Sequence, residues 1–431
     1  MRSLKSRPIL ILAALTLAAA TAAADVGPTY AIRNCRIVPV TGPPIAKGAI
    51  VIRDGLIEAV GPLEKVTVPP DAETIEAEGL VAYPGLVVAH TNLFLEAPRP
   101  ATGEAGDPAF TMPGQTAEPQ EDRFPPGPGQ LVLAQLKFKK STLESWHKAG
   151  VTTVLVAPSR GIFQGQSVLL NLNGEALEPM VLRQPLALHV NFTVDRRAYP
   201  SSLMGTIAYL RQSFLDAGHY AAHQAQFDKL RRGLKRPAYD PFLEALVPFV
   251  RDRRPVVFQC NNQEDIKRAL KIIAEFKLNG LLSGANEAWR VAAELKAANV
   301  PLLVTLNLTP PTGSRYVTQG EELKKKAEAE IYPANASNLA KAGVPFALTG
   351  LGLVEGSALT KNALAAVKAG LPKDKALEAL TLLAARALGV DRELGSLEPG
   401  KIANVILTKG ELFEDKTTVD RVFADGVMFK Y

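Results

Sequence analysis

From about residue 82 onward, short apolar runs alternate with longer segments whose apolar residues recur at helical spacing. This alternation is typical of parallel β/α units, in which each strand is followed by a helix that packs back on the sheet. Seven runs are expected to be strands, at residues 86–89, 151–157, 186–192, 255–260, 280–283, 301–306 and 345–349. An eighth strand near 168–172 would complete a (β/α)8 barrel of the TIM type, and we predict this α/β fold.

The two ends of the chain have a different pattern. Residues 29–80 hold short runs of alternating apolar and polar residues, broken by turns such as Asp54-Gly55, which predicts antiparallel strands. Strand character returns near the C-terminus, with Asp425-Gly426 as a turn. So few C-terminal strands do not fold alone, and we expect them to join the N-terminal ones in a small β-sandwich domain.

These patterns predict a composite domain organisation. The β-sandwich would comprise residues 25–82 and 395–431, and the barrel would comprise residues 83–394. The stretch 96–130 is rich in Pro and Gly and shows little periodicity. Because it follows the first barrel strand, it is expected to lie over the barrel mouth, where such barrels place their sites.

Residues 1–24 have the pattern of a secretory signal peptide. Basic residues precede an apolar run at 9–20, and Ala22-Ala23-Ala24 forms a small-residue cleavage site. The mature chain is expected to start at Asp25, to have no membrane span and to be secreted, most simply into the periplasm. The signal holds three basic residues and no acid, so the net charge of +6 falls to +3 on cleavage. So mild a charge does not imply a nucleic-acid partner.

The chain has two cysteines, Cys35 and Cys260, which lie far apart in the sequence. Export would permit a disulfide between them, but two isolated cysteines do not make a disulfide framework. Their pairing stays open at the level of the sequence.

Three motifs follow one another along the chain. The first is residues 52–57 together with 83–90, the second is 149–154, and the third is 379–389 followed by 394–404. Taken in order, they resemble the amidohydrolase superfamily, and specifically its imidazolonepropionase-like branch, over nearly the whole mature chain. The resemblance implies a barrel with a small β domain. It also implies metal-dependent hydrolysis, usually of C–N bonds, with zinc held by histidines and carboxylates.

The metal-binding motifs of that family are degenerate here. In the family the first barrel strand ends His-x-His, and later strands contribute two more histidines and an aspartate. The corresponding barrel-mouth positions of this chain are His90, Asn92, Gln259, Asn261, Ser283 and Leu351. An amide is a poor substitute for imidazole on zinc. We therefore expect these positions to be vestigial and the chain to bind neither zinc, the norm of the family, nor another cofactor.

The chain keeps the motifs that form the fold and has lost the motifs that would bind metal. This combination is typical of a catalytically degenerate protein, because a fold alone does not determine function. We expect such a protein to bind a small ligand, or to pair as a homo- or hetero-oligomer with an active amidohydrolase. One alternative is an active hydrolase of C–N bonds other than peptide bonds, with a relocated metal site at His90, His189 and Asp195. Whether the chain is an enzyme therefore stays open.

A second alternative is a purely structural subunit of a hydrolase complex, which would use exposed aromatic residues for contact. Tyr199, Phe214 and Tyr220 are the candidates. Among the other histidines, we expect His189 to approach His90 across the barrel mouth and His147 to pack in the helix before the second strand. His219 and His223 have i, i+4 spacing, which predicts one face of a surface helix.

Overall fold

The structure, a computed structural model, describes residues 28–95, 127–194, 199–309 and 330–431, with residues 320, 323 and 327. The expected signal peptide, Asp195 and residues 96–126 of the expected cover over the barrel mouth lie outside the described residues. Within the described part, no helix is both long and apolar enough to cross a membrane.

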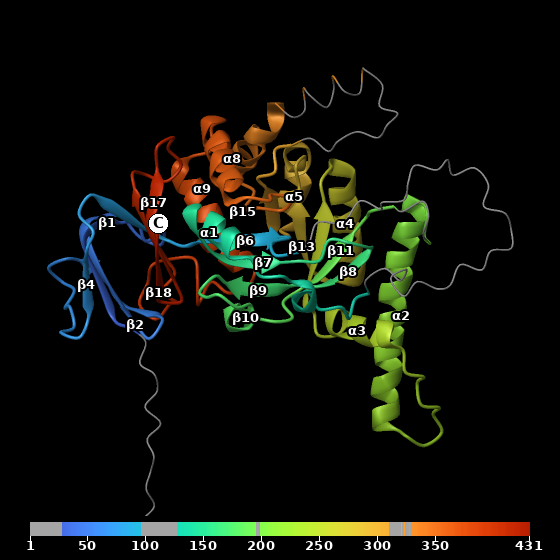
Figure 1. The fold of residues 1–431 in the computed structure, drawn as a ribbon. Coiled ribbons are helices and arrows are strands. Elements are labelled where there is room, and N and C mark those ends of the chain that lie inside the picture. Colours follow the sequence, from blue (N-terminus) through green and yellow to red (C-terminus); the bar gives the residue numbers. More distant parts are fainter. Residues whose placement is uncertain are drawn as a thin grey trace, which may run out of the picture.

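One sheet combines strands from both ends of the chain, coloured blue and red in Figure 1. Its strands are β1 (Tyr30–Ile37), β2 (Ile45–Arg53), β3 (Leu56–Pro62), β4 (Glu73–Glu76), β5 (Leu80–Pro84), β16 (Val405–Lys409), β17 (Thr418–Ala424) and β18 (Val427–Lys430). Their order is β18-β17-β16-β5-β1-β2-β3, with β4 paired to β1. Because β5 bonds to both β1 and β16, strand pairing gives one continuous sheet where the sequence predicts a sandwich.

The two predicted turns are both present in this sheet. Asp54 and Gly55 have φ of 51° and 75°, and Asp425 and Gly426 have φ of 54° and 75°. Two consecutive residues with positive φ suit a two-residue hairpin turn, and glycine adopts this conformation without strain. The turns also pack against each other, since a Cβ on Gly426 would lie 2.8 Å from Gly55 Cα.

The central part of the chain alternates strands and helices. Its strands are β6 (Leu86–Thr91), β7 (Val151–Val156), β8 (Phe163–Gln166), β9 (Val168–Asn171), β10 (Val181–Arg183), β11 (Leu188–Asn191), β12 (Pro255–Cys260), β13 (Asn279–Gly284), β14 (Leu302–Thr305) and β15 (Ala347–Thr349). Its helices include α1 (Lys140–Lys148), α2 (Leu203–Lys229), α3 (Pro241–Val250), α4 (Gln263–Phe276), α5 (Ala292–Ala298), α7 (Asn335–Ala342), α8 (Gly356–Lys368), α9 (Lys373–Ala379) and α10 (Leu382–Ala387). Each of the seven expected strands is present, and β9 lies where the eighth is expected.

These strands form two mixed sheets, β10-β9-β7-β6 and β15-β14-β13-β12-β11-β8. The pairs from β11 to β15 and the pair β6–β7 are parallel, but β9 runs antiparallel to β7 and β8 runs antiparallel to β11. The chain between β7 and β9 spans residues 157–167 and includes β8, so it is shorter than the dozen or more residues that a parallel crossover needs. The predicted parallel barrel is therefore confirmed only as an α/β fold with mixed sheets.

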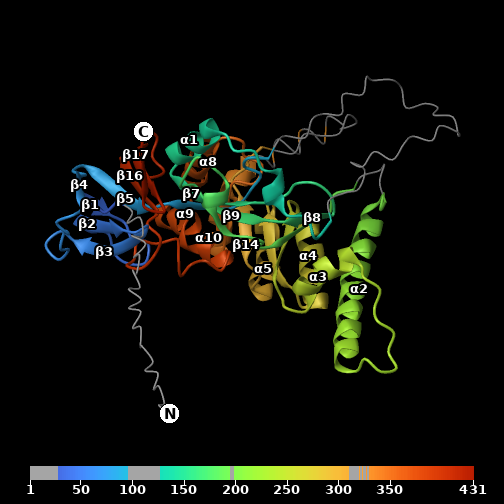
Figure 2. The same cartoon turned by 60° about the horizontal axis from the view of Figure 1, so that its bottom comes forward.

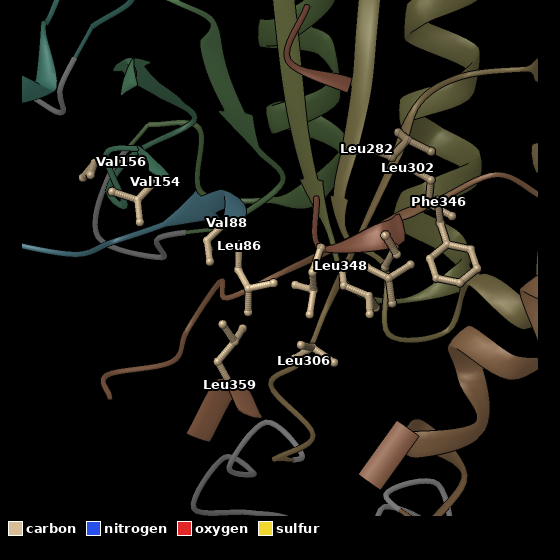
Figure 3. Packing of buried hydrophobic residues seen from close by; sticks show 14 of the residues in the cluster. Leu86, Val88, Val154, Val156, Leu282, Leu302, Leu306, Phe346, Leu348 and Leu359 are labelled. Atoms are coloured by element: carbon tan, nitrogen blue, oxygen red, sulfur yellow. The ribbon is translucent and has the colours of Figure 1, made fainter. Parts of the chain in front are cut away.

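Side chains alternate between two cores along these strands, as the two-residue period of a strand requires. Val87, Leu155, Val257, Leu281, Leu303 and Ala347 pack with one another and with α10 residues such as Ala384 and Ala385. Their neighbours in sequence pack in the larger core with residues of the other helices. Figure 3 shows part of the larger core, with Leu86 and Val88 of β6 and Leu359 of α8.

The three sequence motifs meet where the sheet of the chain ends joins the central part. A Cβ on Gly85 would lie 2.1 Å from Thr152 Oγ1, and Gly85 N donates to Asn404 O at 2.9 Å. Asn404 Nδ2 in turn donates to Thr153 Oγ1 and Asn171 Oδ1 at 2.9 and 2.8 Å. The motifs therefore serve the junction between the two parts, which does not depend on a metal site.

Candidate functional site

Two histidines lie side by side, His90 near the end of strand β6 and His189 near the start of strand β11. The ring centroids of His90 and His189 are 4.8 Å apart with an interplanar angle of 66°, and both side chains have zero exposure. His90 Nδ1 lies 2.7 Å from Ser283 Oγ on β13. The structure thus places His189 against His90, as expected from the sequence, and brings Ser283 to the same point.

Local strand geometry explains how these side chains converge. His189 follows the inward residue Ala187 by two positions, and Ser283 follows Leu281 in the same way, so both extend the inner face of their strands. The pairing of β6 with β7 shifts register between Val88 and Thr91. Such an irregularity re-aims a side chain, and here it allows His90 to reach Ser283 across the strands.

Burial keeps both rings uncharged. It lowers the pKa of His90 to about 3. Burial also places the pKa of His189 well below its ordinary value of 6.5, and the neighbouring charge of protonated His90 would lower it further. A neutral imidazole has one N–H donor and one acceptor nitrogen. The pair is therefore a neutral hydrogen-bonding group near pH 7.

Three of the four ring nitrogens, His90 Nε2 and both nitrogens of His189, have no hydrogen-bond partner within the described residues. Buried polar atoms are nearly always hydrogen-bonded to protein or to a bound molecule. These nitrogens are therefore buried polar atoms whose hydrogen bonds are not made by the described residues.

Amide side chains lie beside the histidines. Gln164 Nε2 and Asn191 Nδ2 both donate to Gln259 Oε1, at 3.5 and 3.4 Å. Gln259 pairs in register with Asn191 on one side and with Ser283 on the other. The amides thus continue the row that His90 and Ser283 begin. Sequence reasoning missed Gln164 and Asn191, although Asn191 carries a signal because it follows His189 by two residues on an apolar strand.

The other predicted positions make contacts of their own. Asn92 Nδ2 donates to Ala157 O at 2.9 Å, and Asn261 is exposed beside Gly284. Leu351 is buried, and its carbonyl accepts from Thr305 Oγ1 at 2.8 Å. Asn92 therefore tethers a loop, and Leu351 contributes an apolar side chain where the resemblance implies an aspartate.

These donors do not fit the zinc that the resemblance implies. A catalytic zinc takes three protein ligands, chiefly imidazole, carboxylate or thiolate. In residues 28–95, 127–194, 199–309 and 330–431, no group of three or more His, Cys, Asp or Glu side chains could hold a metal ion. His90 and His189 supply two such groups, and their remaining neighbours Ser283 and Gln259 are neutral oxygen ligands that zinc accepts poorly.

The remaining histidines and the cysteines have other roles. His147 Nδ1 lies 2.7 Å from Tyr431 Oη and Nε2 lies 2.8 Å from Leu172 O, which fits the expected packing role. His219 and His223 lie on α2 with ring centroids 6.3 Å apart. Cys35 and Cys260 are both free and buried, so they do not form a disulfide.

The aromatic residues proposed for subunit contact are mostly internal. Tyr199 is 90% exposed, but Phe214 and Tyr220 are buried. The expectation of exposure is wrong for these two because they lie on the inner face of α2, where Phe214 packs against Phe163 and Phe276. Of the three aromatic residues, Tyr199 is therefore the one whose side chain is exposed for contact with a partner.

Replacing Ser283 should test the hydrogen bond that holds His90. Ser283→Ala leaves His90 Nδ1 without its partner, and an unsatisfied buried polar atom costs about 1–3 kcal/mol. We expect the free energy of unfolding in urea to fall by that amount. The exposed Ser201→Ala is the matched control and should change it by less than about 0.5 kcal/mol. Equal stability of the two variants would show that the bond does not order the site.

Comparison with known proteins places the chain among similar sequences and folds. Residues 254–428 match the model of the amidohydrolase family. The chain is 28% identical to an imidazolonepropionase of Symbiobacterium thermophilum over 396 residues, which cover 84% of each chain. A shorter stretch of 62 residues is 47% identical to a 5-methylthioadenosine/S-adenosylhomocysteine deaminase of Moorella thermoacetica and covers 14% of each chain. The fold is similar to a crystal structure of an amidohydrolase from Thermotoga maritima, with a TM-score of 0.76, 25% identity and coverage of 93% of this chain and 100% of that one.

Proposed function

The chain belongs to the amidohydrolase superfamily and is imidazolonepropionase-like, and from that premise we propose that it is an exported, catalytically degenerate member that binds a small uncharged ligand. The ligand would take the place of the missing hydrogen-bond partners of His90 and His189.

One observation carries the proposal. Two neutral imidazoles lie in contact on β6 and β11, and three of their ring nitrogens have no partner among the described residues. A hydroxyl and amides lie beside them. Neutral donors and acceptors in a buried site suit an uncharged polar molecule, because an unpaired charge there would lose its hydration. Among the described residues, no group of three or more His, Cys, Asp or Glu side chains is placed to hold a divalent cation there.

Two further parts of the proposal concern the fold and the compartment. The likeness to the Thermotoga maritima amidohydrolase supports a single distorted barrel in which the two mixed sheets adjoin. Thr349 Oγ1 on β15 donates to His90 O on β6 at 2.7 Å, which supports closure between the two sheets. The pattern of residues 1–24 supports export, and a mature N-terminus at Asp25 in the periplasmic fraction would establish it.

A stable cyclic amide provides the test of ligand binding. Hydantoin is uncharged at neutral pH and offers both donors and acceptors. We expect it to raise the free energy of unfolding by about 2.7 kcal/mol at 100 times its Kd, without being hydrolysed. His189→Met should abolish the stabilisation, whereas Ser201→Ala should keep it. Stabilisation that is the same in His189→Met would contradict binding at the histidine pair.

The contact between His90 and His189 also favours a second candidate, a working C–N hydrolase with a relocated metal site that includes Asp195. This candidate predicts turnover of amide substrates that a chelator abolishes, and it predicts that His189→Ala removes both bound metal and turnover. The proposal of a degenerate protein predicts background hydrolysis in every case. The two functions are thus separated by one assay with and without zinc.

A further inference from the structure

A basic segment joins α2 to α3. Residues 228–240 hold five cations, Lys229, Arg231, Arg232, Lys235 and Arg236, against two carboxylates, Asp228 and Asp240. The local net charge is therefore +3, which equals the net charge of residues 25–431. The rest of that span is neutral overall, so its positive charge is concentrated in one short segment.

The five cationic side chains are exposed to solvent and, among the residues that the structure describes, are not neutralised by neighbouring carboxylates. All five are exposed, and within the described chain none of them forms an ion pair. Two other arginines nearby in the sequence differ, since Arg211 on α2 pairs with Glu275 and Arg251, just after α3, pairs with Asp252. Asp240 is engaged as the N-cap of α3, where its Oδ1 accepts from the backbone of Phe242 and Leu243. The segment thus presents positive charge with little internal compensation.

Apolar side chains are interleaved with the cations. Leu230 is 69% exposed, Leu234 is 36% exposed and Tyr239 is 77% exposed. The segment follows the C-terminal end of the 27-residue helix α2, and Figures 1 and 2 show that end projecting past α3 and α4. Residues 229–239, here called the basic tip, therefore combine charge and apolar surface at a projecting point.

We propose that the basic tip binds the surface of an anionic phospholipid membrane. Lys and Arg near such a surface each strengthen binding about fivefold, which corresponds to about 1 kcal/mol. Leucine and tyrosine side chains enter the boundary between headgroups and acyl chains. A nucleic acid would use the cations alone and leave the leucines in water, so the interleaved pattern favours a membrane. This attachment is peripheral and independent of ligand binding at the histidine pair.

Vesicle flotation of the mature chain tests the proposal. We expect binding to vesicles of phosphatidylglycerol and phosphatidylcholine, and little binding to phosphatidylcholine alone. Raising the salt concentration should weaken binding because salt screens exposed charges. The double variant Arg231→Gln with Arg232→Gln should bind about 25-fold more weakly, and Leu230→Ser with Leu234→Ser should also lose affinity.

The matched control removes two exposed cations elsewhere, Lys271 on α4 and Lys361 on α8. Lys271→Gln with Lys361→Gln changes the net charge equally and should leave vesicle binding unchanged. Equal binding by the tip variant and this control would overturn the proposal, as would equal binding to neutral vesicles. Wild-type affinity of the leucine variant, together with competition by heparin, would assign the tip to polyanions in general and also overturn it.

Discussion

Lowering the pH from 7 to 5 should reduce the free energy of unfolding by about 6 kcal/mol. His90, His147 and His189 are buried, and burial lowers the pKa of His90 to about 3, that of His147 to about 4 and that of His189 well below 6.5. The unfolded chain therefore binds more protons than the folded chain below about pH 6.5, so stability is lost as pH falls. Each ring contributes about 2 kcal/mol over this window.

Urea unfolding at the two pH values measures this loss. His189→Met removes one of the three rings, so its loss should be about 4 kcal/mol. His219→Gln, at an exposed position of α2, should keep the wild-type loss. Carboxylates that form salt bridges lose their stabilisation mainly below this window. Equal stability of the wild-type chain at pH 7 and pH 5 would show that the folded histidines take up protons, against the account given above.

Replacing Gly85 by alanine should destabilise the fold by about 3 kcal/mol or more. The added Cβ would lie 2.1, 2.4 and 2.8 Å from the Oγ1, Cγ2 and Cβ of Thr152, and Thr152 is fully buried. Overpacking at a buried position forces side chains and backbone to shift. The backbone of Gly85 is also held by its hydrogen bond to Asn404, so it cannot move away freely.

A second change in the same place distinguishes overpacking from other effects. Adding Thr152→Gly to Gly85→Ala removes the three clashing atoms and should recover part of the lost stability. Gly174→Ala is the control, because nothing lies within 4 Å of its added Cβ, and it should change stability by less than about 0.5 kcal/mol. If Gly85→Ala unfolds at the same urea concentration as Gly174→Ala, the junction is not tightly packed there.

Sequence periodicity predicts where most strands and helices lie, but it does not predict whether neighbouring strands pair in parallel or antiparallel. Apolar runs locate the strands because buried strands need continuous apolar residues. The reversal of β9 against β7 depends on the short stretch of residues 157–167 between them, which apolar periodicity alone does not convey. Similarly, the turns at Asp54-Gly55 and Asp425-Gly426 are recognisable from local chemistry, whereas the joining of β5 to β16 into one sheet is a long-range pairing.

The candidate site could be predicted only in part. The resemblance directs attention to His90 and Ser283, and the predicted strand at 186–192 places His189 where it can approach His90. Gln164 and Asn191 are not predicted as site residues, because no sequence motif marks amide side chains on a strand. The basic tip is not predicted for another reason. The net charge of the whole chain does not show a local excess of positive charge in one segment. Asp195, the third residue of the relocated metal site, lies outside the described residues.

The metal content of the chain tests the central claim most directly. Protein purified without added metal, in buffers free of chelators, would be analysed by mass spectrometry for zinc, iron, manganese and copper. Because a divalent ion needs more ligands than two neutral imidazoles and a hydroxyl, we expect less than about 0.1 equivalent of any of these metals per chain. About one tightly bound zinc per chain, lost in His189→Ala, would contradict the account and establish the relocated site.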